Sequence, residues 1–448
     1  MDDVYRYIDA NRDRFIAELK AFLRIPSVAT DAAAIRTCAE KLMGALSEVG
    51  FKTRLMPSSG NPMVYGELAG NHGAPTVLLY GHYDVMPADD VHNWTSPPFD
   101  PTERDGRIFA RGVGDNKAQH MAHIKAVEAL RACGKATAPL KFVLEGEEET
   151  GSTSLPGFVR DHHEMLQADV CFAADGPRHE SNRPTIYLGC RGVIGFELKV
   201  RTASRDVHSG NRGNVVPNPG WRLLEALSSM RDAKGAITID GFHDDIRPMG
   251  EEDLRLLGAL GFDGAKMGRE LAVPELDTMA AREYHERVMY RPTLNISGLV
   301  SGHGGEGVKN IVPATATAKM DIRLVADQSP DKIMAQVRRH LDARGFGDVE
   351  IVVHDTMKPS RTSAGNNFVA PIVAALREAA GQEPVVLPAL GGSIPQYAFV
   401  EGLGVPCIWS AYANWDEHNH APDENMVVEL FIQAIKMSAN VFHSLGKA

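Results

Sequence analysis

The chain has few cysteines, and their placement suggests neither a disulfide framework nor a thiolate metal site. The five are odd in number and widely spaced, and no Cys-x-x-Cys occurs: Cys38, Cys133, Cys171, Cys190 and Cys407. This usage is typical of reduced thiols in a cytoplasmic protein, which is the location we expect. It also argues against zinc bound through cysteine sulfur.

Long apolar runs and an excess of positive charge are missing as well. No stretch approaches the roughly 18 apolar residues that a membrane-spanning helix needs. The N-terminus lacks the basic and then apolar regions of a secretory signal. The formal net charge at pH 7 is −11, which argues against nucleic acid or an anionic membrane as a partner. A local basic pocket for a small anionic substrate is compatible with that charge.

Apolar periodicity divides the 448 residues, too many for one ordinary core, into three parts. Helical spacing in the first 50 residues is followed by strand-like runs at 76–80, 140–144 and 170–173. Between about 186 and 357, period-two strands and two helical runs indicate an α+β insertion, and the strand–helix pattern returns near 368. We therefore predict an α/β fold with a mainly parallel mixed sheet flanked by helices. Residues 1–185 and 358–448 would form it, around an inserted domain at 186–357.

Four segments concentrate side chains that bind metal ions. In 78–85, LLYGHYDV, an apolar strand ends at His82, and Asp84 follows on the same face of the strand. One of the two can bind metal while a carboxylate orients the imidazole. The other segments are 106–120 with Asp115, 142–152 with three consecutive glutamates, and 413–425 with His418 and His420.

Each segment also has an ordinary interpretation when it is considered alone. The first is a strand end with two solvated polar residues, and Asp115 is a favoured helix N-cap. The glutamates form an acidic turn, whose mutual repulsion a dication would offset. The last segment is a polar surface loop. Only their joint order favours a metal centre.

In that order, GHYDV, RGVGDNK, EGEEETGS, ADG at 174–176 and HAPDE resemble the motifs of one family. It is the co-catalytic zinc metallopeptidase family of the aminoacylase, carboxypeptidase G, acetylornithine deacetylase and carnosinase type. The resemblance runs from about residue 10 to 445. The long insert between His82 and Asp115, which contains HNWTSPPFDPTERDGRIFARG, is most similar to the dipeptidase branch.

The resemblance implies a site with two zinc ions, although manganese or cobalt would accept the same ligands. His82 and Asp175 would hold one ion, Glu149 and His420 the other, and Asp115 would bridge them. Glu148 would be the general base that takes a proton from water, giving the hydroxide that the two ions would share. Asp84 would orient His82.

The inserted domain carries further residues that the resemblance assigns to substrate binding. His208, in Asp-x-His-Ser-Gly, resembles a residue that stabilises the oxyanion, often across a dimer interface. Arg323 matches an arginine that grips a substrate carboxylate. The loop LGGSIPQ, with Gly392 and Ser393, and Asn310 in KNIVPA are further candidates. A homodimer through the inserted domain is implied. A turn histidine is the alternative for His208, and a strand-face salt bridge is the alternative for Arg323.

Three features depart from the family pattern or compete with it. The family often has Asp-Lys-Gly after the bridging aspartate, whereas this chain has Asn116, Lys117 and Ala118. His418 is an alternative ligand if the loop register differs, although His420 fits the His-x-x-x-Glu spacing. Residues 302–307 match G-x-G-x-x-G, but a β-branched segment with Pro313 follows where a dinucleotide site needs a helix.

We expect hydrolysis of an amide bond in a dipeptide or similar small substrate with a free carboxylate. An N-acyl-amino-acid deacylase of the acetylornithine type uses the same centre and is the alternative enzyme. A non-catalytic metal-binding protein of the same fold is the alternative of another class, which the presence of Glu148 disfavours. A purely structural zinc protein would have closed four-ligand sites instead.

Overall fold

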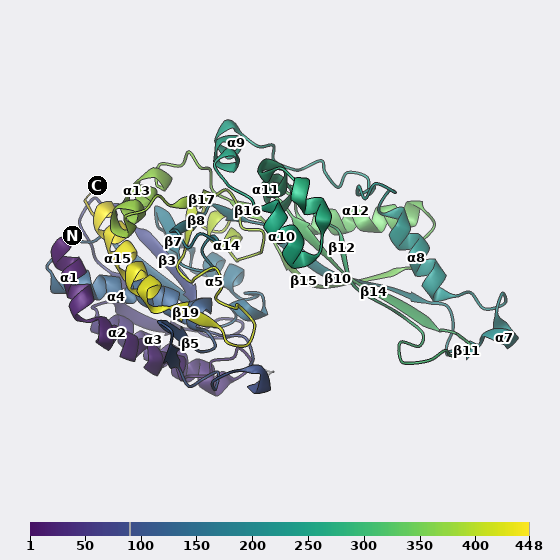
Figure 1. Cartoon of the computed structure of the whole chain (residues 1–448), viewed down its shortest axis with the longest axis horizontal. Helices are drawn as coiled ribbons and strands as arrows, with labels where there is room; N and C mark the ends of the chain where they lie inside the picture. Colours follow the sequence, from purple (N-terminus) through teal and green to yellow (C-terminus); the bar gives the residue numbers. More distant parts are fainter. Residues whose placement is uncertain (89–90, 448) are drawn as a thin grey trace.

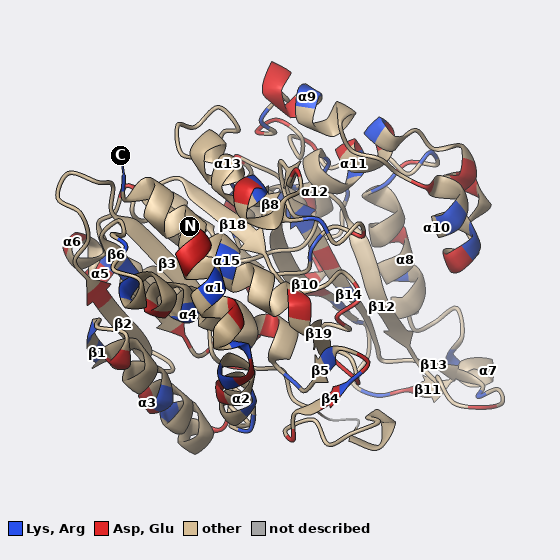
Figure 2. Cartoon of the chain, turned by 60° about the vertical axis from the view of Figure 1, so that its left-hand side comes forward, with Lys and Arg blue, Asp and Glu red and all other residues tan. Residues whose placement is uncertain are grey.

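The computed structural model describes residues 1–88 and 91–447. Figure 1 shows two lobes, one around a large sheet and one elongated lobe that extends away from it. Both termini lie on the lobe with the large sheet, which is therefore built from the two ends of the chain. Acidic and basic positions are intermixed on surface helices such as α3 (Ala32–Glu48) and α10 (Gly264–Leu271) (Figure 2).

The large sheet has eight strands in the order β1-β2-β6-β3-β7-β18-β8-β17. Its centre is parallel, since β3 pairs with β6 and β7, and β7 pairs with β18, all in the parallel sense. This confirms the predicted α/β fold with a mainly parallel mixed sheet. The strands are β1 (Lys52–Met56), β2 (Met63–Leu68), β3 (Val77–His82), β6 (Leu140–Glu145), β7 (Val170–Ala173), β8 (Thr185–Tyr187), β17 (Val385–Leu387) and β18 (Cys407–Ala411).

The central strands are apolar along their whole length because helices cover both faces of the sheet. Every residue of β3, β7 and β18 is buried, the pattern expected of parallel strands with two covered faces. One face packs against α1 (Asp2–Ala10), α2 (Arg12–Leu23), α3, α4 (Ala118–Ala132), α13 (Val369–Ala380) and α15 (Val428–Leu445). The other packs against α5 (Leu155–Asp161) and α14 (Tyr397–Val400).

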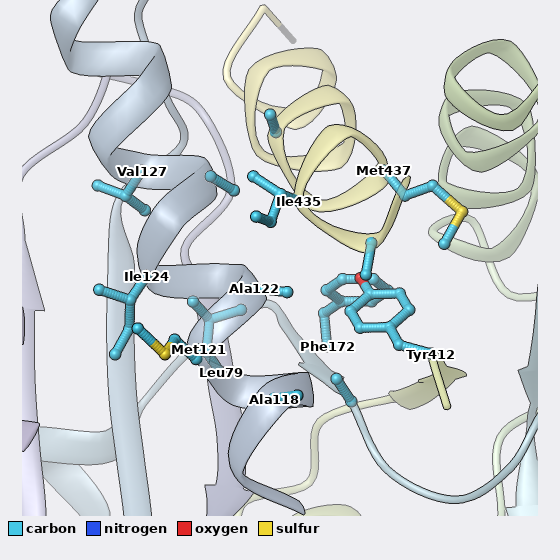
Figure 3. Close-up of a cluster of buried hydrophobic side chains, with 14 of the residues drawn as sticks. Leu79, Ala118, Met121, Ala122, Ile124, Val127, Phe172, Tyr412, Ile435 and Met437 are labelled. Atoms are coloured by element: carbon cyan, nitrogen blue, oxygen red, sulfur yellow. The ribbon is translucent and has the colours of Figure 1, made fainter. Parts of the chain in front are cut away.

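Helices α4 and α15 lie side by side on the first face, although some 300 residues separate them in the sequence. Figure 3 shows Ala122 of α4 on the side that faces Ile435 of α15, with Phe172 of β7 below α15, while Met121 lies beside Ile124 and Leu79. This contact joins the two ends of the chain into one core. Burial of such side chains stabilises the fold by about 1.5–3 kcal/mol each.

The elongated lobe is built on a four-stranded antiparallel sheet in the order β12-β14-β10-β15. Its strands are β10 (Gly192–Arg201), β12 (Asn295–Ser301), β14 (Thr315–Leu324) and β15 (Glu350–Met357). Helices α8 (Pro219–Ser229) and α12 (Pro330–Ala343) cover one face. Inward positions of β10 and β14 alternate with half-exposed ones. The other face is therefore open and polar.

Two sequence expectations differ from the structure in this region. The inserted domain was predicted to begin at about residue 186, but β8 (Thr185–Tyr187) still pairs with β17 and β18 in the large sheet. Three short helices between residues 251 and 290 were not predicted from the sequence: α9 (Glu251–Gly258), α10 and α11 (Ala281–Tyr290). Their charged, eight- to ten-residue sequences show too few apolar repeats to be recognised.

The short elements that remain lie mostly near the loops of the two lobes. They are β4 (Thr102–Arg104), β5 (Arg107–Phe109), α6 (His163–Leu166), β9 (Gly189–Cys190), β11 (Val207–His208), α7 (Ser209–Arg212), β13 (Ile311–Val312), β16 (Ser360–Arg361) and β19 (Asn425–Val427), with short helical turns at 91–93, 113–117, 148–150 and 274–278. Among the described residues, no helix combines the length and apolar character needed to cross a membrane.

His123 of α4 is an uncharged histidine inside the main core. Its ring lies 5.4–6.2 Å, centroid to centroid, from four aromatic rings, and neither ring nitrogen has a hydrogen-bond partner among the described residues. Burial lowers the pKa of His123 to about 3. The aromatic neighbours are Phe142, Phe172, Tyr412 and Phe442.

We predict that His123→Phe makes the protein more resistant to acid. Below about pH 6.5 the unfolded chain binds a proton at this position and the folded chain does not, so the free energy of unfolding falls by about 1.4 kcal/mol per pH unit down to roughly pH 3. Above pH 7 the residue is neutral in both states and this cost vanishes. Urea unfolding of metal-free protein between pH 4.5 and 7.5 measures the difference between variant and wild type. The exposed His72→Phe is the control, and an equal pH slope in both variants would contradict the prediction.

Candidate metal centre

The predicted ligands meet at one edge of the large sheet. His82 ends β3, Glu149 follows β6, and Asp175 follows β7. His420 lies in the loop after β18, and Asp115 precedes α4. Because β3, β6, β7 and β18 are parallel, their carboxyl ends share one edge, which is the usual ligand-binding edge of such sheets.

Asp115 occupies the middle of the cluster and presents one carboxylate oxygen to each of two histidines. His82 Nε2 lies 2.9 Å from Asp115 Oδ1, and His420 Nε2 lies 3.1 Å from Asp115 Oδ2. Asp175 Oδ2 is 3.8 Å from His82 Nε2, and Glu149 Oε2 is 3.1 Å from His420 Nε2. Two ligand triads thus share Asp115.

The two triads fit a pair of divalent cations. In each triad, the ligand atoms of one histidine and two carboxylates all lie within 4.8 Å of one another. Imidazole nitrogen and carboxylate oxygen are ligands that zinc accepts, and three protein ligands leave a position open for water or substrate. The residues therefore suit a metal centre with two ions and a shared carboxylate.

The buried carboxylates of the cluster also favour the binding of cations. Burial, followed by the charge of Asp115, raises the pKa of Asp175 to about 6 and that of Glu149 to about 7. Hydrogen bonds to Asp115 and Glu149 raise the pKa of His420 to about 10. Without metal the centre therefore retains protons at neutral pH. A dication displaces them, so metal affinity should rise with pH.

Asp84 and Glu148 lie beside the triads. His82 Nδ1 is 3.4 Å from the Asp84 Oδ1 atom and 3.1 Å from the Asp84 carbonyl oxygen. The Asp84 carboxylate accepts hydrogen bonds from the backbone N–H groups of Glu148 and Glu149, at 3.1 and 3.0 Å. Asp84 therefore connects the orientation of His82 to the turn that carries Glu148.

The four glutamates of EGEEE are separated by their surroundings. Glu145 accepts hydrogen bonds from Tyr80 and Ser152, and Glu147 accepts them from the backbone of Asn61 and Ser154. Glu149 faces His420. The Glu148 carboxylate has no hydrogen-bond partner among the described residues. Burial raises its pKa well above the usual range, and the charges of Asp175 and Asp115 contribute.

The backbone around Asp115 is held by Glu424, a residue that the sequence analysis used only to set the register of His420. The buried Glu424 carboxylate accepts hydrogen bonds from the N–H groups of Gly112, Gly114 and Asp115, at 2.9 to 3.1 Å. It also pairs with Arg111 at 2.8 Å. Asp115 itself has extended dihedral angles (φ −122°, ψ 91°) and is not the N-cap of α4, which is Lys117. The cap interpretation is therefore wrong.

Gly114 lies against a second buried acid, Glu417, which sequence patterns did not single out. A Cβ atom at Gly114 would lie 1.9 Å from Glu417 Oε2, so a larger residue there would displace the Glu417 carboxylate. Glu417 is buried, and neither carboxylate oxygen has a hydrogen-bond partner among the described residues. Burial, followed by the charges of Asp115 and Glu424, raises the pKa of Glu417. Only the glycine in RGVGD pointed to this close approach.

The register of the last loop brings His420, and not His418, to the cluster. His418 is exposed, and its Nδ1 atom lies 3.3 Å from the carbonyl oxygen of Pro422. Both histidines have positive φ, 58° and 57°, a backbone conformation that non-glycine residues adopt only when their surroundings impose it.

Two of the predicted substrate residues meet across the lobes. Arg323, on the open face of the small sheet, donates from Nη1 to Ser393 Oγ at 2.8 Å, and Gly392 is adjacent in the same loop. His208 and Asn310 lie together instead at the far tip of the elongated lobe, where β11 and α7 are drawn in Figure 1. Within one chain the structure does not bring them to the metal cluster.

One family model and several curated relatives match most of the chain. The model of peptidase family M20/M25/M40 matches residues 78–444. A β-Ala-His dipeptidase of Rattus norvegicus is 26% identical over all of this chain and 96% of its own length. A cysteinylglycine-S-conjugate dipeptidase of Corynebacterium striatum is 32% identical over 72% of this chain and 70% of its own.

Solved structures resemble the chain over nearly its whole length. An M20 family metallo-carboxypeptidase from Sulfolobus solfataricus superposes with a TM-score of 0.90 at 32% identity, covering 97% of this chain and 99% of its own. Human carnosine dipeptidase 1 gives a TM-score of 0.83 at 26% identity, covering 100% and 99%. The likeness therefore includes both lobes.

Proposed function

Since the chain belongs to peptidase family M20/M25/M40, we propose that it is a two-zinc dipeptidase that cleaves an amide bond next to a free carboxylate. It is a metal-dependent hydrolase of peptide bonds, as its dipeptidase relatives are. The observation that carries the proposal is the pair of triads that share Asp115, with Glu148 beside them and the Arg323–Ser393 pair across the lobes.

The side chains around the metal centre have different roles in hydrolysis. When bound, the two ions would polarise the scissile carbonyl and lower the pKa of water enough for it to lose a proton at neutral pH. Glu148, whose carboxylate is otherwise unengaged, takes the proton from the attacking water and later gives it to the leaving amine. Asp84 holds His82 in position through Nδ1.

The Arg323–Ser393 pair defines the substrate end that the enzyme recognises. A guanidinium that already donates to a serine hydroxyl keeps further N–H groups for a carboxylate. In this proposal a free C-terminal carboxylate binds there and the preceding amide reaches the metal centre. This arrangement suits dipeptides, and it also suits removal of one C-terminal residue from a longer peptide.

Carboxypeptidase action is therefore the second candidate, favoured by the likeness to the Sulfolobus metallo-carboxypeptidase. An N-acyl-amino-acid deacylase uses the same centre and the same carboxylate grip. The three activities differ in what lies on the amino side of the cleaved bond, which is a single residue, a longer peptide or an acyl group.

We predict that dipeptides with a free C-terminus are hydrolysed with the highest kcat/KM in a matched panel. The panel is Ala-Ala, Ala-Ala-Ala, N-acetyl-Ala and Ala-Ala-amide, assayed by amine release. Arg323→Gln should raise KM for Ala-Ala by about tenfold or more and change kcat less, because the grip contributes mainly to binding. The exposed Arg344→Gln on the same lobe is the control. Cleavage of N-acetyl-Ala but of no dipeptide would reject the dipeptidase.

A homodimer through the elongated lobe explains the position of His208 and Asn310. The lobe exposes large apolar side chains on α8 and on β12, which is an outer strand of the small sheet. The start of α8 adjoins the end of β12, since a Cβ at Gly220 would lie 3.1 Å from Ser301 Oγ. The exposed residues are Trp221, Leu224, Ile296, Leu299 and Val300. An apolar surface beside an open strand edge fits a second copy of the chain.

In such a dimer the tip of one subunit could supply His208 to the metal centre of the other. We predict that Glu148→Gln and His208→Ala, each nearly inactive alone, restore activity when mixed and allowed to exchange subunits. Each mixed dimer has one complete site, so a statistical mixture should reach about a quarter of wild-type activity. Mixing either variant with the double variant is the control. No recovery in a mixture that forms mixed dimers would reject action across the interface.

The donor set and the cysteines support the remaining details. Histidine and carboxylate ligands favour zinc, while manganese and cobalt accept the same set. All five cysteines are free in the structure, which supports a reducing, cytoplasmic location.

A further inference from the structure

A second arginine lies beside Arg323 on the open face of the small sheet. Val193 of β10 pairs with Arg323 of β14, and Arg191 precedes Val193 by two residues, so that it shares the same face. Arg191 lies one residue before β10, so it continues the ladder diagonally from Arg323, at a spacing of about 7–8 Å that long side chains bridge readily. Sequence patterns gave no reason to select Arg191.

Arg191 is also tied to the glycine-rich loop that carries Ser393. Its backbone N–H donates to the carbonyl oxygens of Leu390 and Gly392, at 3.2 and 3.1 Å, and its Nε donates to the Gly391 carbonyl at 2.7 Å. The Nη2 atom lies 3.8 Å from the position of a Cβ at Gly391. Both guanidiniums thus meet the same loop, Arg323 at Ser393 and Arg191 at Gly391.

The positive charge of this pair is not neutralised by neighbouring acids. Neither guanidinium has a carboxylate oxygen within 4.0 Å among residues 1–88 and 91–447. Asp321, on the same face, accepts instead from the Asn295 amide at 2.8 Å. Burial lowers the pKa of Arg191 to about 10, and the repulsion from Arg323 outweighs the attraction of Asp321. The loop therefore lies against two half-buried cations.

A single substrate carboxylate satisfies only one of these cations. Arg323 uses one N–H on Ser393 and Arg191 uses one on Gly391, so each keeps N–H groups on its terminal nitrogens. Two guanidiniums side by side match two carboxylates better than one, since each can form a charge-assisted pair.

We propose that Arg191 and Arg323 together hold a doubly anionic substrate end, so that the enzyme prefers dipeptides whose C-terminal residue is aspartate or glutamate. Arg323 binds the α-carboxylate, as in the proposed function on which this inference rests. Arg191 binds the side-chain carboxylate and is a specificity-determining residue.

The test compares Ala-Glu with Ala-Gln, two substrates of nearly equal shape that differ by one charge. Wild-type enzyme loaded with zinc should show a kcat/KM for Ala-Glu about tenfold or more above that for Ala-Gln, the size expected of one hydrogen-bonded charge pair. Arg191→Gln should bring this ratio close to one, while Arg191→Lys retains most of it. Arg201→Gln, which removes an exposed arginine from the other end of β10, is the matched control and should leave the ratio unchanged.

Several outcomes would overturn the inference. A wild-type ratio near one does so directly. If Arg191→Gln lowers kcat/KM for Ala-Glu and for Ala-Gln by the same factor, Arg191 only holds the loop in place. If Arg191→Gln does not fold, inhibition of wild type by free glutamate and glutamine gives the same comparison, and equal inhibition rejects the preference. Absence of hydrolysis of both dipeptides by wild type would instead reject the proposed function.

Discussion

Glu148→Gln should retain two metal ions per chain and lower kcat for a dipeptide by about 10²–10⁴-fold, the range expected for loss of a general base. The Glu148 carboxylate is free of hydrogen bonds to the described residues, while its neighbour Glu149 faces His420. Glutamine keeps the shape of the side chain but cannot accept a proton from water. KM should change little, because Glu148 makes no contribution to the carboxylate grip.

The measurement combines metal content by mass spectrometry with steady-state kinetics. Glu147→Gln is the matched control, since Glu147 is one residue away and bonds to the backbone of Asn61 and Ser154. That variant should lower the melting temperature and reduce kcat less than about tenfold. Full activity in metal-loaded Glu148→Gln would show that another group moves the proton.

Asp115→Asn should have the largest effect on the metal centre itself. The variant should lose both ions, and its activity should fall by at least about 10³-fold. The two oxygens of Asp115 lie 2.9 and 3.1 Å from His82 and His420, so one carboxylate belongs to both triads. An amide removes the shared negative charge and one of the two acceptor oxygens. The substitution should leave the fold intact, because Glu424 bonds to the backbone of Asp115 and not to its side chain.

Metal content after dialysis and activity across added zinc concentrations measure this effect. Asp84→Asn is the control, because Asp84 contacts His82 and is not a member of either triad. It should lower metal affinity or activity only about 10–100-fold. Two tightly held ions in Asp115→Asn would contradict the shared-ligand arrangement.

Much of the fold follows from local patterns in the sequence. The apolar runs at 76–80, 140–144 and 170–173 became strands at nearly the same residues, because burial of both strand faces imposes this pattern. The charged helices between 251 and 290 have no such pattern and could not be found. The position of β12 at the edge of the small sheet could not be predicted either. The exposed Leu299 and Val300 look like part of an ordinary strand until the partner strand is known.

For the site, the sequence alone determined the kinds of ligand and their order along the chain, because a metal centre of this family needs particular donors after particular strands. Only the tertiary structure decided how they combine. It brings His82 and His420, 338 residues apart, to opposite oxygens of Asp115, and it distinguishes Glu148 from the structural Glu145 and Glu147. It also shows Glu424 and Glu417 around Asp115 and places Arg191 beside Arg323. These relations depend on which strands are neighbours and on where burial leaves a charge without a partner, and neither property can be read from local sequence.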